Sequence, residues 1–236
     1  MNTVSLTLFR FTSLPSRLWV LGQMGAARFS LMRMPEIHFW KLCGSGTGEG
    51  FTPKPNAAVW AILATWPDAE TARTQIMAAP VFRRWRDHAE ESWTILLQPI
   101  SSRGKWSGVS PFCVADQSVS PSGPIVALTR ATMRFSRFLQ FWQRVPDISA
   151  VIGKDPSVIF KIGIGEVPLL HQVTFSIWPD AASMARFARG DGPHGRAIQA
   201  VRAENWFSEE LYARFSILDA WGRWNGIDPL GRNAAA

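Results

Sequence analysis

Four histidines are the residues best suited to bind a metal or to transfer protons, and their surroundings differ. His194 is spaced four and seven residues from Ile198 and Val201, so its ring shares the apolar face of a predicted helix. Two interpretations fit this placement. The residue is either a hydrogen-bonded core or capping histidine, or an axial ligand of a metal or haem.

The other three histidines have weaker patterns. His171 alternates with Val173 and Phe175 on one face of a predicted strand, so a core histidine is its first interpretation and a ligand its second. His88 lies among charged residues near the end of a predicted helix, and His38 has no supporting pattern. We therefore rank His194 first and His171 second as candidate ligands.

The cysteine and glycine patterns exclude several kinds of site. Cys43 and Cys113 lie far apart with no CxxC or CxxCH, which excludes a disulfide framework, a cysteine-rich zinc site and covalent haem attachment. Cys43 is expected to be a buried thiol and not a haem ligand. The glycine-rich run 44–50 lacks the Lys-Ser or Lys-Thr of a P-loop, and no helix pattern follows it. It predicts a hairpin loop.

Composition and charge indicate a globular protein with an anionic partner. Of the 236 residues 47% are hydrophobic and 18% are charged, which excludes a largely disordered chain. The longest apolar run, 57–64, is too short to span a bilayer, and the N-terminal residues do not resemble a secretory signal, so we expect a cytoplasmic protein. A net charge of +7 with 12 tryptophans and 15 phenylalanines favours a membrane surface over nucleic acid.

The two halves of the chain repeat each other. Matches recur in the same order: Arg10-Phe11 with Arg134-Phe135, Ser16-Arg17 with Ser136-Arg137, Lys41 with Lys161, Trp66-Pro67-Asp68-Ala69 with Trp178-Pro179-Asp180-Ala181, Pro80 with Pro193, Trp93 with Trp206, and Trp106-Ser107-Gly108 with Trp224-Asn225-Gly226. They divide the chain into a first repeat, 1–108, a linker rich in proline and serine, 109–124, and a second repeat, 125–236. In this alignment Val81 stands where the second repeat has His194.

Each repeat predicts the same series of elements. The first predicts strands at 4–11, 37–42, 57–66 and 94–100 with helices at 16–32 and 68–93. The second predicts strands at 125–134, 158–164, 169–178 and 212–220, with helices at 136–152, from Asp180 to a break at 190–193, and from there to about 206. The order strand, helix, strand, strand, helix, strand is that of a ferredoxin-like unit. We predict an α+β protein in which two such units pack face to face as a dimeric α+β barrel within one chain, with an apolar interior able to admit a ligand.

Several charged residues fall within the predicted elements, where a charge needs a partner. They are Lys41, Arg130, Arg134, Lys161, Arg202 and Arg214. Ordinary ion pairs with Glu166, Glu209 or Glu210 are the first interpretation, and pairing of an arginine with haem propionates is the alternative. The first helix carries Arg17, Arg28 and Arg33 among large apolar residues, so it is either a packed core helix or a basic amphipathic patch that rests on lipid.

Long strings in both halves resemble spheroidene monooxygenases, the acyclic carotenoid 2-ketolases of purple bacteria. They are KIGIGEVPLL at 161–170, residues 172–178, WF at 206–207, EELYARF at 209–215, FWKL at 39–42 and GSGTGEGFTP at 44–53. The resemblance covers nearly the whole chain, apart from the linker and the residues after Gly226. It implies a monooxygenase with non-covalent b-type haem that uses O2 and reduced ferredoxin. Two hydroxylations and a dehydration would then convert spheroidene, or a related acyclic carotenoid, to its 2-keto product.

The resemblance also implies roles for particular residues. Chlorite dismutases and dye-decolourising peroxidases, which are related barrels, hold haem through a histidine of one half, so His194 becomes the expected axial ligand, with His171 in reserve. Arg202 is then expected to bind the cofactor, and Gln172 and Arg214 to polarise oxygen on its distal side. Peripheral membrane association follows from the apolar substrate. A carotenoid-binding barrel without catalysis and a cofactor-free barrel monooxygenase are the alternatives.

Overall fold

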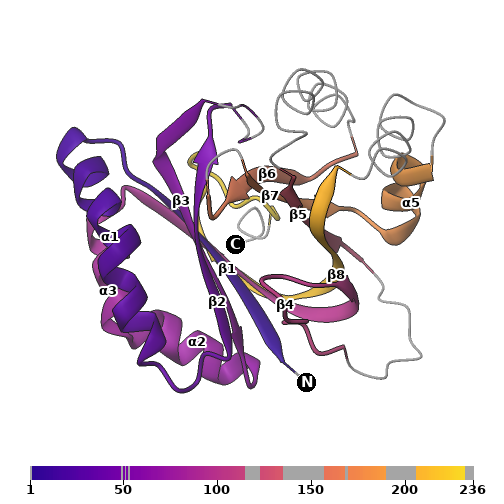
Figure 1. The fold of residues 1–236 in the computed structure, drawn as a ribbon, viewed down its shortest axis with the longest axis horizontal. Coiled ribbons are helices and arrows are strands. Elements are labelled where there is room, and N and C mark those ends of the chain that lie inside the picture. Colours follow the sequence, from indigo (N-terminus) through magenta and orange to yellow (C-terminus); the bar gives the residue numbers. More distant parts are fainter. Residues whose placement is uncertain are drawn as a thin grey trace.

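Eight antiparallel strands close into a barrel in the computed structural model, which describes residues 2–48, 50, 52, 54–114, 123–134, 157–167, 170–189 and 206–231 (Figure 1). The first half contributes β1 (Thr3–Arg10), α1 (Leu14–Met32), β2 (Phe39–Gly46), β3 (Pro55–Trp66), α2 (Ala69–Ala78), α3 (Pro80–His88) and β4 (Glu91–Gly104). The second half contributes β5 (Ile125–Met133), β6 (Phe160–Gly165), β7 (His171–Trp178), α5 (Ala181–Arg189) and β8 (Phe207–Gly222).

The strand order confirms the predicted fold class. Around the barrel the strands run β1-β3-β2-β6-β7-β5-β8-β4, so each half keeps the 4-1-3-2 order of a ferredoxin-like sheet. The two sheets join where β2 pairs with β6 and where β4 pairs with β8. Closure on both sides leaves neither sheet with an open edge, which is how one chain forms the dimeric α+β barrel. The limits of the two repeats, 1–108 and 125–236, stay a prediction.

The repeated Trp-Pro-Asp-Ala motif begins a helix in each half. The Asp68 carboxylate accepts a hydrogen bond from the backbone N–H of Thr71 at 2.7 Å, and Asp180 accepts one from Ser183 at 2.6 Å. Each carboxylate therefore satisfies one of the free N–H groups of the helix start, as the sequence predicts for Asp180. These hydrogen bonds to the ionised form also lower the pKa of both aspartates.

Two predicted elements of the first half need correction. The helix expected at 68–93 is divided, because Ala79 is extended and Pro80 starts α3 as a new helix. The strand β4 begins at Glu91, so Trp93 belongs to the sheet, where it pairs with Leu8. The glycine-rich run leads from β2 into β3 and forms part of a hairpin, as predicted. The helix predicted at 136–152, residues 193–205 of the last predicted helix, and linker residues 115–122 lie outside the described residues. Trp206, the predicted end of that helix, is described and lies just before β8 without helical structure.

Some of the matches between the halves are out of register. They are Arg10 with Arg134, Lys41 with Lys161, and Trp93 with Trp206. Lys41 pairs with Leu63, which lies three residues before Trp66. Lys161 pairs with Ser176, which lies only two residues before Trp178. Because side chains alternate along a strand, a shift of one residue puts the two lysines on opposite faces of the barrel wall.

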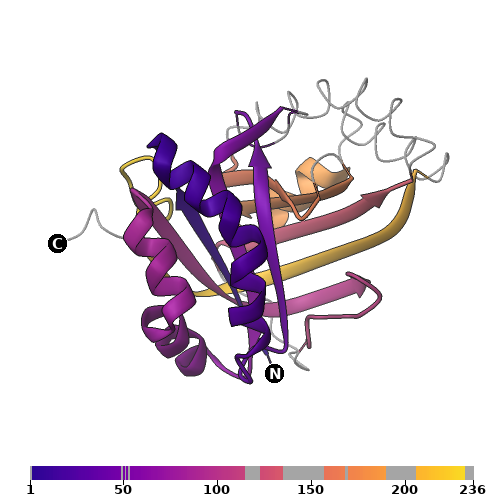
Figure 2. The ribbon, with the colours of Figure 1, turned by 60° about the vertical axis from the view of Figure 1, so that its left-hand side comes forward.

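Side chains fill the inside of the barrel. One buried cluster draws residues from all eight strands, among them Leu6, Trp93, Leu128, Phe175 and Phe215. A second cluster lies outside the first sheet, beneath α1, α2 and α3 (Figure 2). A barrel of eight strands is either filled by its own side chains or holds one small ligand, and the described side chains occupy this one. The expectation of an interior that admits a ligand stays a prediction. None of the described helices is long and apolar enough to cross a membrane.

The repeated Trp-x-Gly motif links the two halves reciprocally. Glu209 on β8 accepts hydrogen bonds from the backbone N–H groups of Ser107 and Gly108, in the turn after β4. Glu91 on β4 accepts equivalent bonds from Asn225 and Gly226, in the turn after β8. Each carboxylate also pairs with an arginine of its own half, Arg130 with Glu209 and Arg10 with Glu91. We call each of these carboxylates, together with its two N–H donors and its arginine, a clasp. The two clasps lie at opposite ends of the paired strands β4 and β8.

Replacing Gly104, which lies at the end of β4 just before one clasp, by alanine is expected to destabilise the protein by about 3 kcal/mol. Gly104 has φ of +99°, and a Cβ built there would lie 2.1 Å from the carbonyl oxygen of Glu210. The free energy of unfolding in urea measures the effect. Gly22→Ala in α1 is the control, because a Cβ there meets nothing within 4 Å and alanine favours the helix. Equal stability of Gly104→Ala and wild type would contradict the prediction.

Candidate functional site

The sequence-predicted site residues fall on different faces of the barrel wall. His171 shares the interior face of β7 with Val173 and Phe175, which belong to the interior cluster. Gln172, the next residue, points to the outer face. Arg214 is exposed on β8, between Ala213 and Phe215 of the interior cluster, so it also lies outside. Thus Gln172 and Arg214 share the outer side, and His171 is separated from them by the sheet.

His171 belongs to a group of charged and polar side chains at one end of the barrel interior, which we call the Glu166 cluster. Its members are Lys41, Trp106, Arg130, Glu166, His171 and Glu209. The Glu166 carboxylate lies 2.9 Å from Nζ of Lys41, accepts a hydrogen bond from Nε1 of Trp106 at 2.9 Å, and lies 3.4 Å from Nδ1 of His171. Glu166 follows β6 in the hairpin, so it brings β2, β7 and the turn after β4 to one point.

Arg130 is the most deeply buried charge of the cluster, with 2% of its side chain exposed. Its guanidinium contacts Glu209, and its Nε lies 3.8 Å from Glu166. The first interpretation of Arg130 and Lys41, ion pairing with Glu166 and Glu209, is confirmed. Sequence reasoning missed Trp106 as a member, although its repeated Trp-x-Gly motif is the signal that marks it.

Burial controls protonation in and beside the cluster. It lowers the pKa of His171, with Glu166 acting against the shift and Arg130 and Lys41 acting with it. Burial also opposes ionisation of Glu209, but the N–H groups of Gly108 and Ser107 and the charge of Arg130 outweigh it, so the pKa of Glu209 falls. His171 is therefore neutral and Glu209 ionised at pH 7.

Cys43 lies beneath this cluster as a fully buried free thiol. Burial is the main cause that raises its pKa, and the nearby Glu166 adds to the shift. The thiol therefore stays protonated, which confirms its prediction as a buried thiol and makes it a poor metal ligand.

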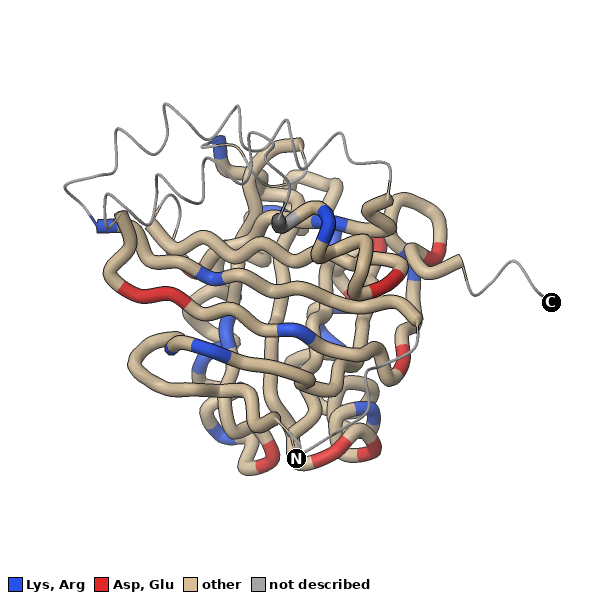
Figure 3. The backbone as a smooth tube through the Cα atoms, turned by 90° about the vertical axis from the view of Figure 1, so that its right-hand side faces the viewer, with Lys and Arg blue, Asp and Glu red and all other residues tan. Residues whose placement is uncertain are grey.

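The outer side of the second sheet, which we call the second outer face, contains Gln172 and Arg214. It is formed by the outward side chains of β5, β6, β7 and β8, and Figure 3 shows lysine and arginine positions within strands of the barrel wall. Gln172 pairs across from Ala131, and Arg214 pairs across from Ala127. Since Ala127 and Ala131 lie four residues apart on β5, the two polar residues are separated by about 13 Å along the strands.

The strand register allows the two outer faces to be compared position by position. In the first sheet Phe9 pairs with Trp60, six residues before Trp66. The equivalent pair of the second sheet, six residues before Trp178, is Ala131 with Gln172. A pair of large aromatic residues in one half is thus replaced by a methyl group and an amide in the other.

The same difference extends across the sheet. Where the first sheet pairs Ile62 with Leu42, the second pairs Thr174 with Gly163. Where Ser5 pairs with Leu96, the second sheet pairs Ala127 with Arg214. The first outer face forms a large buried cluster with its helices, whereas the described residues of the second contribute only Ile125, Trp178 and Met184 as buried members. The second outer face therefore combines small side chains with hydrogen-bonding groups.

His194 and Arg202 lie outside the described residues. Val81, the residue matched to His194, is 2% exposed at the start of α3. It belongs to the cluster packed between the first outer face and its helices. The match of His194 with Val81 stays a prediction.

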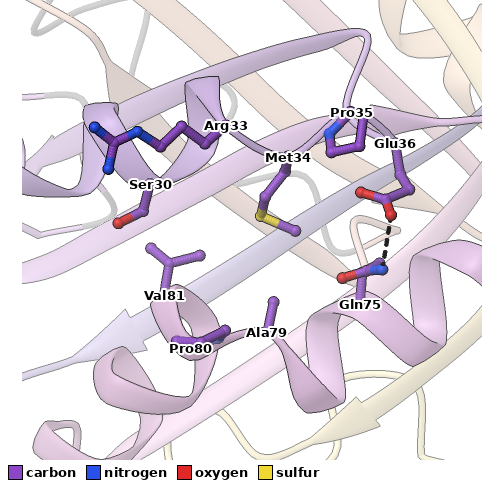
Figure 4. A pocket seen from close by; sticks show the side chains of 9 residues that line it. All are labelled: Ser30, Arg33, Met34, Pro35, Glu36, Gln75, Ala79, Pro80 and Val81. Atoms are coloured by element: carbon purple, nitrogen blue, oxygen red, sulfur yellow. Dashed lines mark hydrogen bonds between the residues drawn. The ribbon is translucent and has the colours of Figure 1, made fainter.

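A pocket of about 340 Å³ lies between the end of α1 and the junction of α2 and α3 (Figure 4). Met34, Ala79 and Val81 form its apolar part, and Gln75 donates a hydrogen bond to Glu36 at 3.2 Å at its edge. None of the sequence-predicted site residues lines it. We therefore take the second outer face as the candidate site.

Comparisons with known structures find the same fold. An aldoxime dehydratase matches with a TM-score of 0.60 at 10% identity, over 92% of this chain and 82% of that protein. A second aldoxime dehydratase, solved in complex with butyraldoxime, matches with a TM-score of 0.59 at 9% identity, over 92% of this chain and 80% of that one. These identities are too low to carry function, and they support the barrel fold alone.

Comparisons of sequence find much nearer relatives. None of the protein-family profiles compared with the chain matches it. The spheroidene monooxygenase of Cereibacter sphaeroides is 57% identical over 100% of this chain and 73% of its own length. That of Rhodobacter capsulatus is 55% identical over 98% and 96%, and that of Rubrivivax gelatinosus 32% over 89% and 80%. With such identity along almost its full length, the chain belongs to the spheroidene monooxygenase family.

Proposed function

We propose that this protein is a haem-dependent carotenoid monooxygenase that introduces a keto group at C2 of spheroidene or a related acyclic carotenoid, using O2 and reduced ferredoxin. Its relatives, named for spheroidene, support the substrate class. We further propose that b-type haem binds non-covalently against the second outer face.

The replacement of large residues by small ones on that face is the observation that carries the proposal. Haem is a flat, largely apolar ring with two carboxylates, so it needs a sheet face that lets it approach closely and a cation at its edge. Ala131, Thr174 and Gly163 stand where the first sheet has Phe9, Ile62 and Leu42. Arg214 stands exposed at the position of Leu96 and offers a guanidinium. The residues present therefore fit the group.

His194 would hold the haem iron, because Val81, the residue to which the repeat matches it, packs toward the equivalent face of the first sheet. His171 is the less suitable reserve ligand, since its ring points into the barrel interior and lies 3.4 Å from Glu166. Arg202 is the proposed partner of a haem carboxylate. The proposal of haem binding therefore depends mainly on His194.

When bound, haem supplies activation of O2 for two successive hydroxylations at one carbon, each consuming two electrons and two protons and releasing water. The doubly hydroxylated carbon then loses water to give the ketone. The chain holds the substrate so that C2 is the carbon presented, which is a matter of positioning. Gln172, half-buried on the second outer face, provides an amide that donates hydrogen bonds to oxygen, and Arg214 provides a positive charge.

The proposed location is the cytoplasmic side of the inner or intracytoplasmic membrane, with peripheral attachment. An acyclic carotenoid is insoluble in water, so the enzyme must receive it from a bilayer. The net charge of +7 suits a surface rich in anionic lipids.

Purified full-length protein, reconstituted with spheroidene, ferredoxin and its reductase, is expected to form a 2-ketocarotenoid and to show a haem Soret band. Pigment analysis and the absorption spectrum measure both. Ketone formation by colourless, haem-free protein would favour a cofactor-free barrel monooxygenase. Carotenoid binding without a Soret band or a ketone would favour a carotenoid-binding barrel. Either result would overturn the haem proposal.

A further inference from the structure

Helix α1 carries an apolar row on the side that faces solvent. The row consists of Leu14, Leu18, Leu21, Phe29 and Met32, with exposed fractions between 49% and 70%. Spacings of three and four residues, with Gly25 in the gap, align these residues along one side of the helix. Val20, Ala27 and Leu31 form the buried side against the first sheet. The helix therefore has two apolar faces, of which the protein itself covers one.

The exposed row, which we call the α1 stripe, is large for an isolated surface feature. From Leu14 to Met32 it runs about 27 Å along the helix axis. Single exposed apolar residues are common on protein surfaces, but a continuous row of this length marks a contact surface. Figure 2 shows α1 at the front of the helical layer that covers the first sheet.

Most of the charges around the α1 stripe are positive. The helix contains no acidic residue, and Arg17 and Arg28 lie along one edge of the stripe, with Arg33 at its C-cap. The neighbouring α3 adds Arg83, Arg84 and Arg86 against a single acidic residue, Asp87. Among the described residues, Arg17, Arg28 and Arg33 form no ion pair with a carboxylate.

Two surfaces could cover the α1 stripe, a second copy of the chain or a lipid membrane, and these charges favour the membrane. A second copy of the chain, packed stripe to stripe, would bring arginines against arginines with no acidic residue of α1 between them. Anionic lipid headgroups supply the missing negative charge, and the acyl chains beneath them receive the leucines and Phe29. We propose that α1 docks this protein in the plane of a membrane that contains anionic lipids. This inference rests on and deepens the proposed function, because it names the surface that meets the membrane.

Vesicle binding by the full-length protein tests the proposal. We expect binding to phosphatidylglycerol-containing vesicles that weakens at high salt, and weaker binding to pure phosphatidylcholine. Leu18→Asp combined with Phe29→Asp should lower the partition coefficient at least about 30-fold, because two large side chains no longer enter the bilayer. Arg17→Gln combined with Arg28→Gln should lower it about tenfold on anionic vesicles at low salt. Val109→Asp combined with Val114→Asp, which changes two exposed residues in the segment after β4, is the matched control.

Circular dichroism verifies folding of each variant, and light scattering measures its oligomeric state. Wild-type protein that does not bind anionic vesicles, or α1 variants that bind as wild type does, would overturn the proposal. A wild-type dimer that Leu18→Asp with Phe29→Asp converts to a monomer, with vesicle binding unchanged, would show a self-association face instead. The assay contains no carotenoid or electron donor, so a protein that binds vesicles but forms no ketone refutes only the proposed function.

Discussion

The His194→Ala protein is expected to lack a Soret band and to form ketocarotenoid at least about 100-fold more slowly than wild type, since even partners outside the ligand shell of a metal contribute 10- to 100-fold. Loss of the axial ligand removes the only bond from the chain to the iron that the proposal contains. The absorption spectrum of the purified protein measures haem content, and pigment analysis after reconstitution measures the rate.

Three comparisons separate ligation from folding. His194→Gly with added imidazole should regain the Soret band, because free imidazole occupies the space left by the side chain. His38→Ala should retain the band as a matched control. His171→Ala should also retain it, because His171 faces the interior beside Glu166. A band lost in His171→Ala and kept in His194→Ala would assign the ligand to β7.

Replacing Arg130 by methionine is expected to lower the free energy of unfolding by about 3 kcal/mol, because it removes the buried cation from an ion pair and leaves the charge of Glu209 without its arginine. Arg130 is 2% exposed and contacts both Glu209 and Glu166, which are 24% and 10% exposed. Methionine keeps most of the apolar volume of the arginine side chain, so the loss reports charge and hydrogen bonding more than packing. Urea unfolding at pH 7 measures the change.

The repeat supplies the control for this substitution. Arg10→Met breaks the equivalent clasp, but the Arg10 side chain is 29% exposed against 2% for Arg130, so its charge is already partly solvated and we expect a loss of only about 1 kcal/mol. Arg130→Met combined with Glu209→Gln should recover part of the stability, because no charge is left without its partner and the glutamine oxygen still accepts from one of the two N–H groups of Ser107 and Gly108. If Arg10→Met and Arg130→Met lowered the free energy of unfolding equally, the burial of the arginine would not determine the size of the loss, and the prediction would be wrong.

Local patterns predicted most of the elements and the fold class. Alternation of apolar residues located β1, β5 and β7 within a few residues, and Asp180 was predicted as a helix N-cap from its own position. The errors arose where the outcome depends on distant strands. The sequence-based prediction extends the helix to Trp93, but the pairing of Trp93 with Leu8 places it in β4. The match of Lys41 with Lys161 is out of register by one residue for the same reason. Strand register is set by the neighbouring strands and not by spacing along the chain.

The candidate site shows the same difference between what local patterns predict and what distant strands determine. The resemblance implies roles in one site for Gln172, Arg214 and His171. The structure places His171 on the opposite face of the sheet from the other two, because adjacent residues of a strand point to opposite faces. It also shows Trp106, Glu166 and Arg130 together, although they come from three distant segments. No local signal reports such a meeting.

By itself the amino-acid sequence determined that the chain is a duplicated α+β unit, that each unit has an apolar sheet face to bury, and which family it resembles. These properties depend on residue type and on periodicity over a few turns or strands. The tertiary structure decided that the barrel interior is filled by side chains and the Glu166 cluster, and that small residues gather on the second outer face. Both outcomes follow from closure of eight strands, which sets what lies opposite each side chain.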